Sequence, residues 1–95
     1  VRSLVGHGVG TKLHEPPQVP GYVRGAITDT LPLEAGMTIA IEIIYTKGKP
    51  AIEYSNTDGW TIATQDKSLT AVFEHSVLIT DTNPEVLTLN VIEGP

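Results

Sequence analysis

Short runs of β-favouring residues, separated by turn-forming residues, set the pattern of this 95-residue chain. Most of the nine glycines and seven prolines fall between these runs, which is typical of strands joined by tight turns. The pattern predicts strands over residues 8–14, 38–45, 60–64, 69–80 and 85–91. It predicts turns over residues 16–21, 47–50, 56–59, 65–68 and 81–84. Residues 25–33 fit either a short helix or a loop, so the expected body of the chain is a single sheet.

Two glutamates interrupt the most apolar of these strands. Glu42 lies within the run IAIEII, and Glu74 lies within the run AVFEHSVLI. A buried carboxylate needs a cation, a proton or hydrogen-bond donors, because an unpaired buried charge is strongly destabilising. An edge strand with its glutamate in water would explain either residue alone. No lysine or arginine lies within either run, so two such glutamates make a bound metal a serious candidate.

The histidines supply the remaining type of metal ligand. His7 is flanked by Gly6 and Gly8, which let other groups approach the backbone closely. His14 follows His7 by seven positions, an odd number, which places the two side chains on opposite faces of a regular strand. They can therefore serve one site only if a bulge or bend intervenes. His75 lies directly beside Glu74 and is expected to point to the other face, in a structural role.

Charge and composition exclude several classes of function. The net charge is −5 at pH 7, and the six lysines and arginines are scattered singly, which leaves no basic surface for nucleic acid or anionic lipid. No apolar run approaches the roughly 18 residues of a membrane span, and no basic-then-apolar leader is present. The absence of cysteine excludes disulfides, thiolate ligands and cysteine nucleophiles. We therefore expect a cytoplasmic protein without nucleic-acid or membrane partners.

Four ordered segments resemble the type I methionine aminopeptidases. GHGVGTKLHEPPQVP (residues 6–20) resembles their histidine segment, and GMTIAIE (36–42) is similar to their first glutamate strand. DGWT (58–61) and DKSLTAVFEH (66–75) resemble their closing strands. The likeness covers nearly the whole chain. Prolidases and aminopeptidase P share the Gly-His-Gly-x-Gly pattern and a glutamate strand but lack the DGWT and FEH patterns, so they rank second.

The resemblance implies a fold class and a domain organisation. It implies the α+β pita-bread fold of the creatinase and aminopeptidase relatives, of which this chain would be a mostly β part, a curved antiparallel sheet with little helix. Residues 1–95 are expected to be the C-terminal catalytic segment of a pita-bread metallopeptidase domain, without its N-terminal half and its backing helices. The alternatives are a non-catalytic pita-bread binding module and a small protein that uses the sheet as an interaction surface.

The resemblance also implies an activity and a metal site. The complete enzyme would remove N-terminal methionine from polypeptides with water activated by two divalent ions, of Co, Mn, Fe or Zn. His7 and Glu42 would bind one ion, and Glu74 would bridge it to the second. His14 would be catalytic, contacting the scissile amide. The family takes two further aspartate ligands from its N-terminal half, so the isolated chain is expected to be inactive and to hold at most one ion. The chain's own aspartates, which do not match the family's aspartate motif, are Asp29, Asp58, Asp66 and Asp81.

Substrate contacts follow from the same resemblance. Trp60 would line the pocket for the methionine side chain of an N-terminal methionine peptide. Leu13 and Ile44 stand at neighbouring pocket positions, where their residue types differ from the family's usual choice. Ile43 replaces the proline that usually follows the first glutamate. The missing N-terminal half, or a second copy of the chain, is the expected protein partner.

Overall fold

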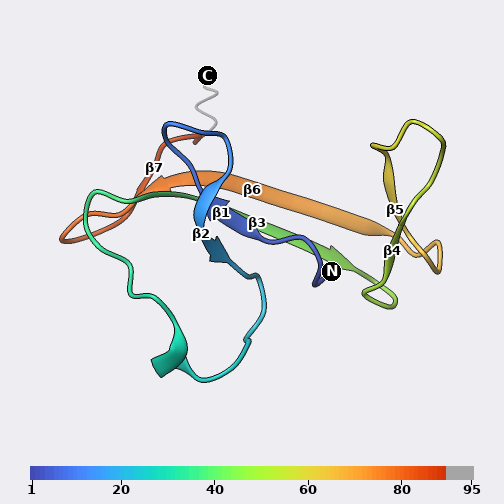
Figure 1. Ribbon diagram of the computed structural model, residues 1–95, viewed down its shortest axis with the longest axis horizontal. Coiled ribbons are helices and arrows are strands. Elements are labelled where there is room, and N and C mark those ends of the chain that lie inside the picture. Colours follow the sequence, from blue (N-terminus) through green and yellow to red (C-terminus); the bar gives the residue numbers. More distant parts are fainter. Residues whose placement is uncertain (90–95) are drawn as a thin grey trace, which may run out of the picture.

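Strands predominate in the computed structural model, which describes residues 1–89 (Figure 1). The elements are β1 (Gly6–Gly8), β2 (Glu15–Val19), the 3-10 helix η1 (Ile27–Asp29), β3 (Thr38–Thr46), β4 (Ile52–Tyr54), β5 (Ile62–Thr64), β6 (Thr70–Leu78) and β7 (Glu85–Val86). Five strands form one sheet in the order β2-β1-β3-β6-β7, and β4 pairs separately with β5. Every pairing is antiparallel. The prediction of a mostly β chain with little helix is confirmed, although the second, two-stranded sheet is not what the pattern predicts.

The long strands β3 and β6 form the centre of the larger sheet. They pair in an unbroken antiparallel register over all nine residues of each strand. Directly opposite residues share a face of a sheet, so Glu42, which is opposite Glu74, lies on the same face. The core is small and lies where β1 and β6 flank β3. Its buried hydrophobic residues in the described part of the chain are Ile39, Ala40 and Val77.

The predicted strand over residues 8–14 is wrong, because the chain reverses there. β1 ends at Gly8, residues 9–14 form a loop, and β2 returns alongside β1. Two hydrogen bonds hold this reversal: the Gly10 N–H donates to the Lys12 carbonyl over 3.1 Å, and the Lys12 N–H donates to the Glu15 carboxylate over 3.1 Å. Local hydrogen bonds of this kind compete with extended structure, and here they convert a predicted strand into a hairpin.

The predicted turn over residues 16–21 is wrong in its first part, because residues 16–19 belong to β2. β2 lies at an edge of the sheet, which is where strands accept proline. Gly8 makes the pairing possible, since a Cβ at this position would overlap the backbone of Pro16. Gly8 is thus a site of close backbone approach, as its place beside His7 in the sequence predicts.

The other elements agree with the pattern to within a few residues. The turns predicted over 47–50, 56–59, 65–68 and 81–84 all lie between strands, and residues 25–33 contain only the one-turn helix η1. β4 is too short, at three residues, to stand out in the pattern. Of the strand predicted over 85–91, residues 85–86 form β7, the prediction is wrong for residues 87–89, and residues 90–91 lie outside the described residues. Within residues 1–89, no helix is long and apolar enough to cross a membrane.

Asp66 joins the turn between β3 and β4 to the turn between β5 and β6. Its carboxylate accepts hydrogen bonds from the Lys49 N–H (2.8 Å), the Ser68 N–H (3.1 Å) and the Ser68 hydroxyl (2.6 Å). A Cβ on Gly48 would overlap this carboxylate, so the glycine leaves room for the contact. The hydrogen bond from the Ser68 hydroxyl, followed by those from the Lys49 and Ser68 amides, lowers the pKa of Asp66 from 3.8 to about 2.

This low pKa predicts a pH dependence of stability. A carboxyl whose pKa is lower in the folded state stabilises that state above its unfolded pKa, and the contribution is lost as the pH falls through the folded pKa. The difference in free energy of unfolding between the wild type and Asp66→Asn is therefore expected to change between pH of about 4 and about 2, in the direction that removes the wild-type advantage. Denaturant unfolding of both proteins across this range measures it. A pH-independent difference would contradict the role given to the charged form.

Candidate metal centre

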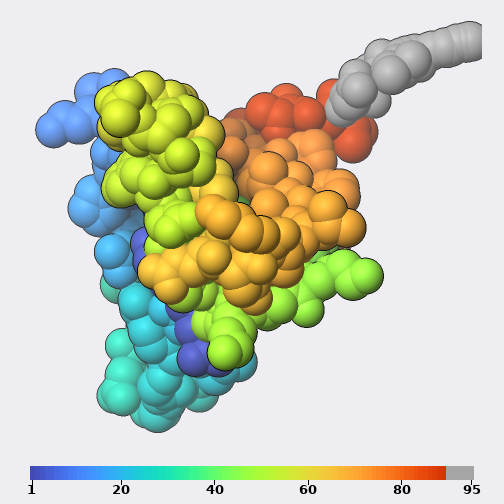
Figure 2. Space-filling model, turned by 90° about the vertical axis from the view of Figure 1, so that its right-hand side faces the viewer, coloured from blue at the N-terminus to red at the C-terminus, as the bar shows by residue number. Residues whose placement is uncertain are grey.

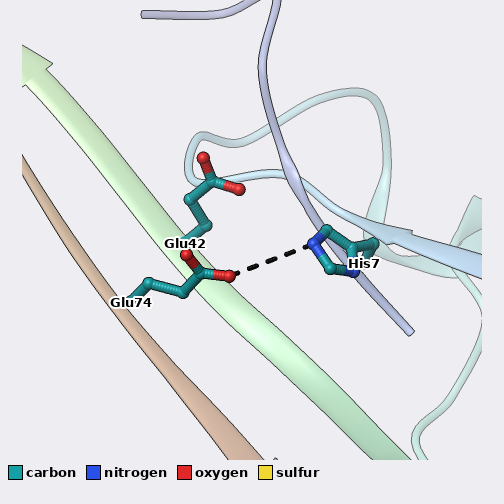
Figure 3. A group of neighbouring side chains, drawn as sticks. All are labelled: His7, Glu42 and Glu74. Atoms are coloured by element: carbon teal, nitrogen blue, oxygen red, sulfur yellow. Dashed lines mark ion pairs between the residues drawn. The ribbon is translucent and has the colours of Figure 1, made fainter. Parts of the chain in front are cut away.

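One imidazole and two carboxylates converge on one face of the larger sheet (Figure 3). They belong to His7, Glu42 and Glu74, and one ligand atom from each lies within 4.8 Å of the others. Within the group, His7 Nε2 lies 4.0 Å from Glu74 Oε1. The structure thus brings together the three residues that the sequence predicts as metal ligands, from strands β1, β3 and β6.

Strand register explains this convergence. Glu42 is opposite Glu74 in the β3–β6 pair, and His7 is opposite Ala40 in the β1–β3 pair. Because Ala40 is two residues before Glu42, all of these side chains leave the same face. Gly6 permits β1 to lie this close to β3, since a Cβ there would overlap the Ala40 carbonyl and lie 3.1 Å from the Glu42 nitrogen.

The two carboxylates are more exposed than the sequence predicts. Glu42 is half-buried and Glu74 is exposed, with 48% of its side chain accessible. The apolar runs around them suggest burial on both faces, but in the described chain both carboxylates remain accessible to solvent. What favours a cation is therefore the proximity of two carboxylates rather than their burial. Among the ion pairs of residues 1–89, neither glutamate contacts a lysine or arginine.

The chemistry of these three groups fits a divalent metal ion. His7 Nδ1 lies 2.9 Å from the Gly8 carbonyl oxygen, which can only accept a hydrogen bond. Nδ1 therefore carries a proton, and Nε2, which faces Glu74, is the nitrogen left to bind a metal ion. A histidine ligand held by a backbone carbonyl through its other nitrogen is the usual arrangement at metal sites. Two carboxylates with one imidazole suit Mn, Fe, Co or Zn.

His14 lies beside this group without belonging to it. Its ring centroid is 4.2 Å from that of His7, and the ring planes are tilted by 50°. The register of the β1–β2 pair shifts between His7 and Gly8, and this irregularity, with the following loop, is the bend that a shared site requires. His75 occupies a different place: it is exposed, opposite Ile41, and its Nδ1 lies 2.9 Å from the Thr88 hydroxyl.

The three residues predicted to contact substrate are not gathered into one pocket. Ile44 lines a cavity of about 310 Å³ that Glu42 also lines. Leu13, in the loop after β1, is 72% exposed, and Trp60, in the loop between β4 and β5, is 83% exposed. Sequence reasoning missed the other walls of this cavity. The sequence does signal Val72, because it lies two residues before Glu74 and therefore shares its strand face. The remaining lining residues include Leu4, Ile52 and Ile62.

A sheet face that carries a histidine and two glutamates beside a second histidine has the side chains of a divalent-metal site. The chain belongs to the metallopeptidase family M24, whose model matches residues 1–81. It is 40% identical over 91 residues to a methionine aminopeptidase of Buchnera aphidicola, and 43% identical over 89 residues to one of Escherichia coli. These alignments cover 94% of this chain and 33% of each relative. The chain therefore spans about a third of the length of these curated relatives.

Solved structures agree with the sequence comparison. The methionine aminopeptidase of Thermotoga maritima matches with a TM-score of 0.86 at 44% identity, over 95% of this chain and 35% of that structure. The enzyme of Rickettsia prowazekii matches with a TM-score of 0.84 at 38% identity, over 94% of this chain and 35% of that structure. The prediction that this chain has the pita-bread fold of these proteins is confirmed.

Proposed function

We propose that this chain is the C-terminal catalytic segment of a metal-dependent methionyl aminopeptidase, which removes N-terminal methionine from polypeptides. The convergence of His7, Glu42 and Glu74 on one sheet face carries this proposal. Relatives named methionine aminopeptidase, at 40–43% identity, support the choice of substrate. The prolidase and aminopeptidase P interpretation stays second, and the presence together of His7, His14, Glu42 and Glu74 argues against a non-catalytic module. The cytoplasmic location stays a prediction.

The side chains of this segment have separate tasks in the proposed reaction. His7, Glu42 and Glu74 would hold metal through one imidazole nitrogen and two carboxylates. When bound, two divalent ions supply Lewis acidity and lower the pKa of a shared water. His14 donates a hydrogen bond to the oxygen that becomes charged in the transition state. This segment supplies three ligand residues, so alone it would hold at most one ion.

An exposed apolar face of the larger sheet supports the proposal that another protein segment packs against this chain. Ile41, Tyr45 and Phe73 lie on the face opposite the metal ligands, and they are 38%, 50% and 63% exposed. Tyr45 and Phe73 stack on each other with ring centroids 5.8 Å apart. Apolar surface of this kind is expected to pack against other protein. We propose the N-terminal half of the complete protein as that partner, with self-association of the segment as the substitute in its absence.

Activity of the complete protein and of residues 1–95 tests this proposal. We expect the complete protein to release methionine from methionine-initiated peptides, to lose this activity with a chelator, and to regain it with Co, Mn, Fe or Zn. Residues 1–95 with the same ions are expected to release none and to scatter light as more than a monomer. Cleavage of X-Pro peptides in place of Met peptides would select the prolidase reading. An active, monomeric 95-residue segment would refute the division of the site between two halves.

A further inference from the structure

One carboxylate organises the loop between β4 and β5. Asp58 Oδ1 accepts hydrogen bonds from the backbone N–H groups of Trp60 (2.8 Å) and Thr61 (2.9 Å), and its Oδ2 accepts one from the Thr61 hydroxyl (2.7 Å). Gly59 stands between them with φ at +70°, a conformation that glycine adopts without strain. The chain can therefore fold back far enough for both amides to reach the same oxygen.

These bonds determine where the indole of Trp60 points. The residue is 83% exposed, so packing against the described chain contributes little to its orientation. The backbone of Trp60, by contrast, is bonded directly to Asp58. The direction of an exposed side chain depends on the conformation of its backbone and on its rotamer. Asp58 fixes the backbone conformation of Trp60.

The loop is continuous with the metal centre through β5. Ile62, two residues after Trp60, lines the cavity that Glu42 and Ile44 also line. In Figure 1 the β4–β5 loop and the loop between β1 and β2, which carries His14, rise on the same side of the long β3–β6 pair. Figure 2 shows the two loops, yellow-green and light blue, toward the same side of the molecule. The face that holds the metal ligands thus has the Trp60 loop at one end.

We propose that Asp58 is a positioning residue for substrate specificity: its carboxylate fixes the backbone of Trp60 and so holds the indole where the first side chain of the substrate binds. This rests on the proposed function, in which Trp60 contacts that side chain. The hydrogen bond from the Thr61 hydroxyl, followed by those from the Thr61 and Trp60 amides, lowers the pKa of Asp58 from 3.8 to about 2. Asp58 is therefore ionised, and the loop held, at any pH above about 4.

Selectivity of the complete protein among Met, norleucine and Leu peptides tests the role of Asp58. Trp60→Ala is expected to change the Met-to-Leu ratio of kcat/KM by about tenfold, the scale of one methylene in a pocket. Asp58→Ala is expected to change the ratio in the same direction, mainly through KM, with bound metal unchanged. Asp58→Asn is expected to restore it, because the amide oxygen accepts the same two N–H groups and the amide nitrogen donates to Thr61.

Matched variants separate positioning from stability. Asp66→Ala removes the same kind of carboxylate from the neighbouring turn and is expected to leave selectivity unchanged. If Asp58→Ala does not fold, Asp58→Ser keeps a weaker acceptor and is expected to give a smaller shift in the same direction.

Four results would overturn the proposal. The first is a folded Asp58→Ala protein with wild-type selectivity while Trp60→Ala has altered selectivity. The second is an Asp58→Asn protein that does not regain wild-type selectivity, and the third is an Asp66→Ala protein whose selectivity shifts as much as that of Asp58→Ala. The fourth is a Trp60→Ala protein with unchanged selectivity. Of these results, only unchanged selectivity in Trp60→Ala would also contradict the contact between Trp60 and substrate in the proposed function.

Discussion

Replacing Glu74 by glutamine in the complete protein is expected to remove bound metal and activity together. The amide has the shape of the carboxylate but lacks its charge, and it is a much poorer ligand for a divalent ion. Glu74 faces His7 Nε2 at 4.0 Å and shares a site with Glu42, so its loss affects the centre of the group. Changes to residues that merely support metal ligands reduce activity by about 10- to 100-fold. We therefore expect Glu74→Gln to lower activity by at least about a hundredfold.

Metal analysis of the purified variant, together with Met-peptide hydrolysis, measures both losses. Glu53→Gln is the matched control, because Glu53 is a carboxylate on β4 that pairs with Lys67 at 2.5 Å and lies outside the ligand group. It is expected to keep metal and activity. A Glu74→Gln protein with the full metal content would show that Glu74 is not a ligand.

Replacing His14 by alanine is expected to separate metal binding from catalysis. His14 lies 4.2 Å from His7, measured between ring centroids, but contributes no atom to the group of three ligands. Metal content should therefore remain. The lost hydrogen bond is one that forms to developing charge, so the loss should fall mainly on kcat. Removing one such donor typically lowers kcat by about 100- to 1,000-fold.

His75→Ala provides the control for this experiment. His75 contacts Thr88 rather than the ligand group, so we expect this variant to keep both its metal and its kcat. Steady-state kinetics and metal analysis of the two histidine variants decide the assignment. Loss of metal from His14→Ala would overturn the division of roles between the two histidines.

Sequence reasoning succeeded where local pattern and tertiary structure agree. The alternation and β-branched content of residues 38–45 and 69–80 predict two long strands, and β3 and β6 occupy these segments. The positions of Glu42 and Glu74 within them picked out two of the three side chains that the structure brings together. Sequence reasoning failed at residues 8–14, where the reversal depends on hydrogen bonds among loop residues and on an edge place for β2. It also predicted buried carboxylates, because apolar neighbours along a strand do not reveal whether a second layer covers them.

The sequence by itself determined which residue types could make a metal site and that strands would carry them. Spacing along the chain left His7 and His14 on opposite faces, and nothing in the strand pattern alone related either histidine to Glu42 or Glu74. Only the tertiary structure decided that relation, through the register of β1, β3 and β6 and the irregularity after His7. The physical reason is that register depends on pairing between strands that are distant in the sequence. A shift of one residue in this register would turn every side chain of the strand to the other face.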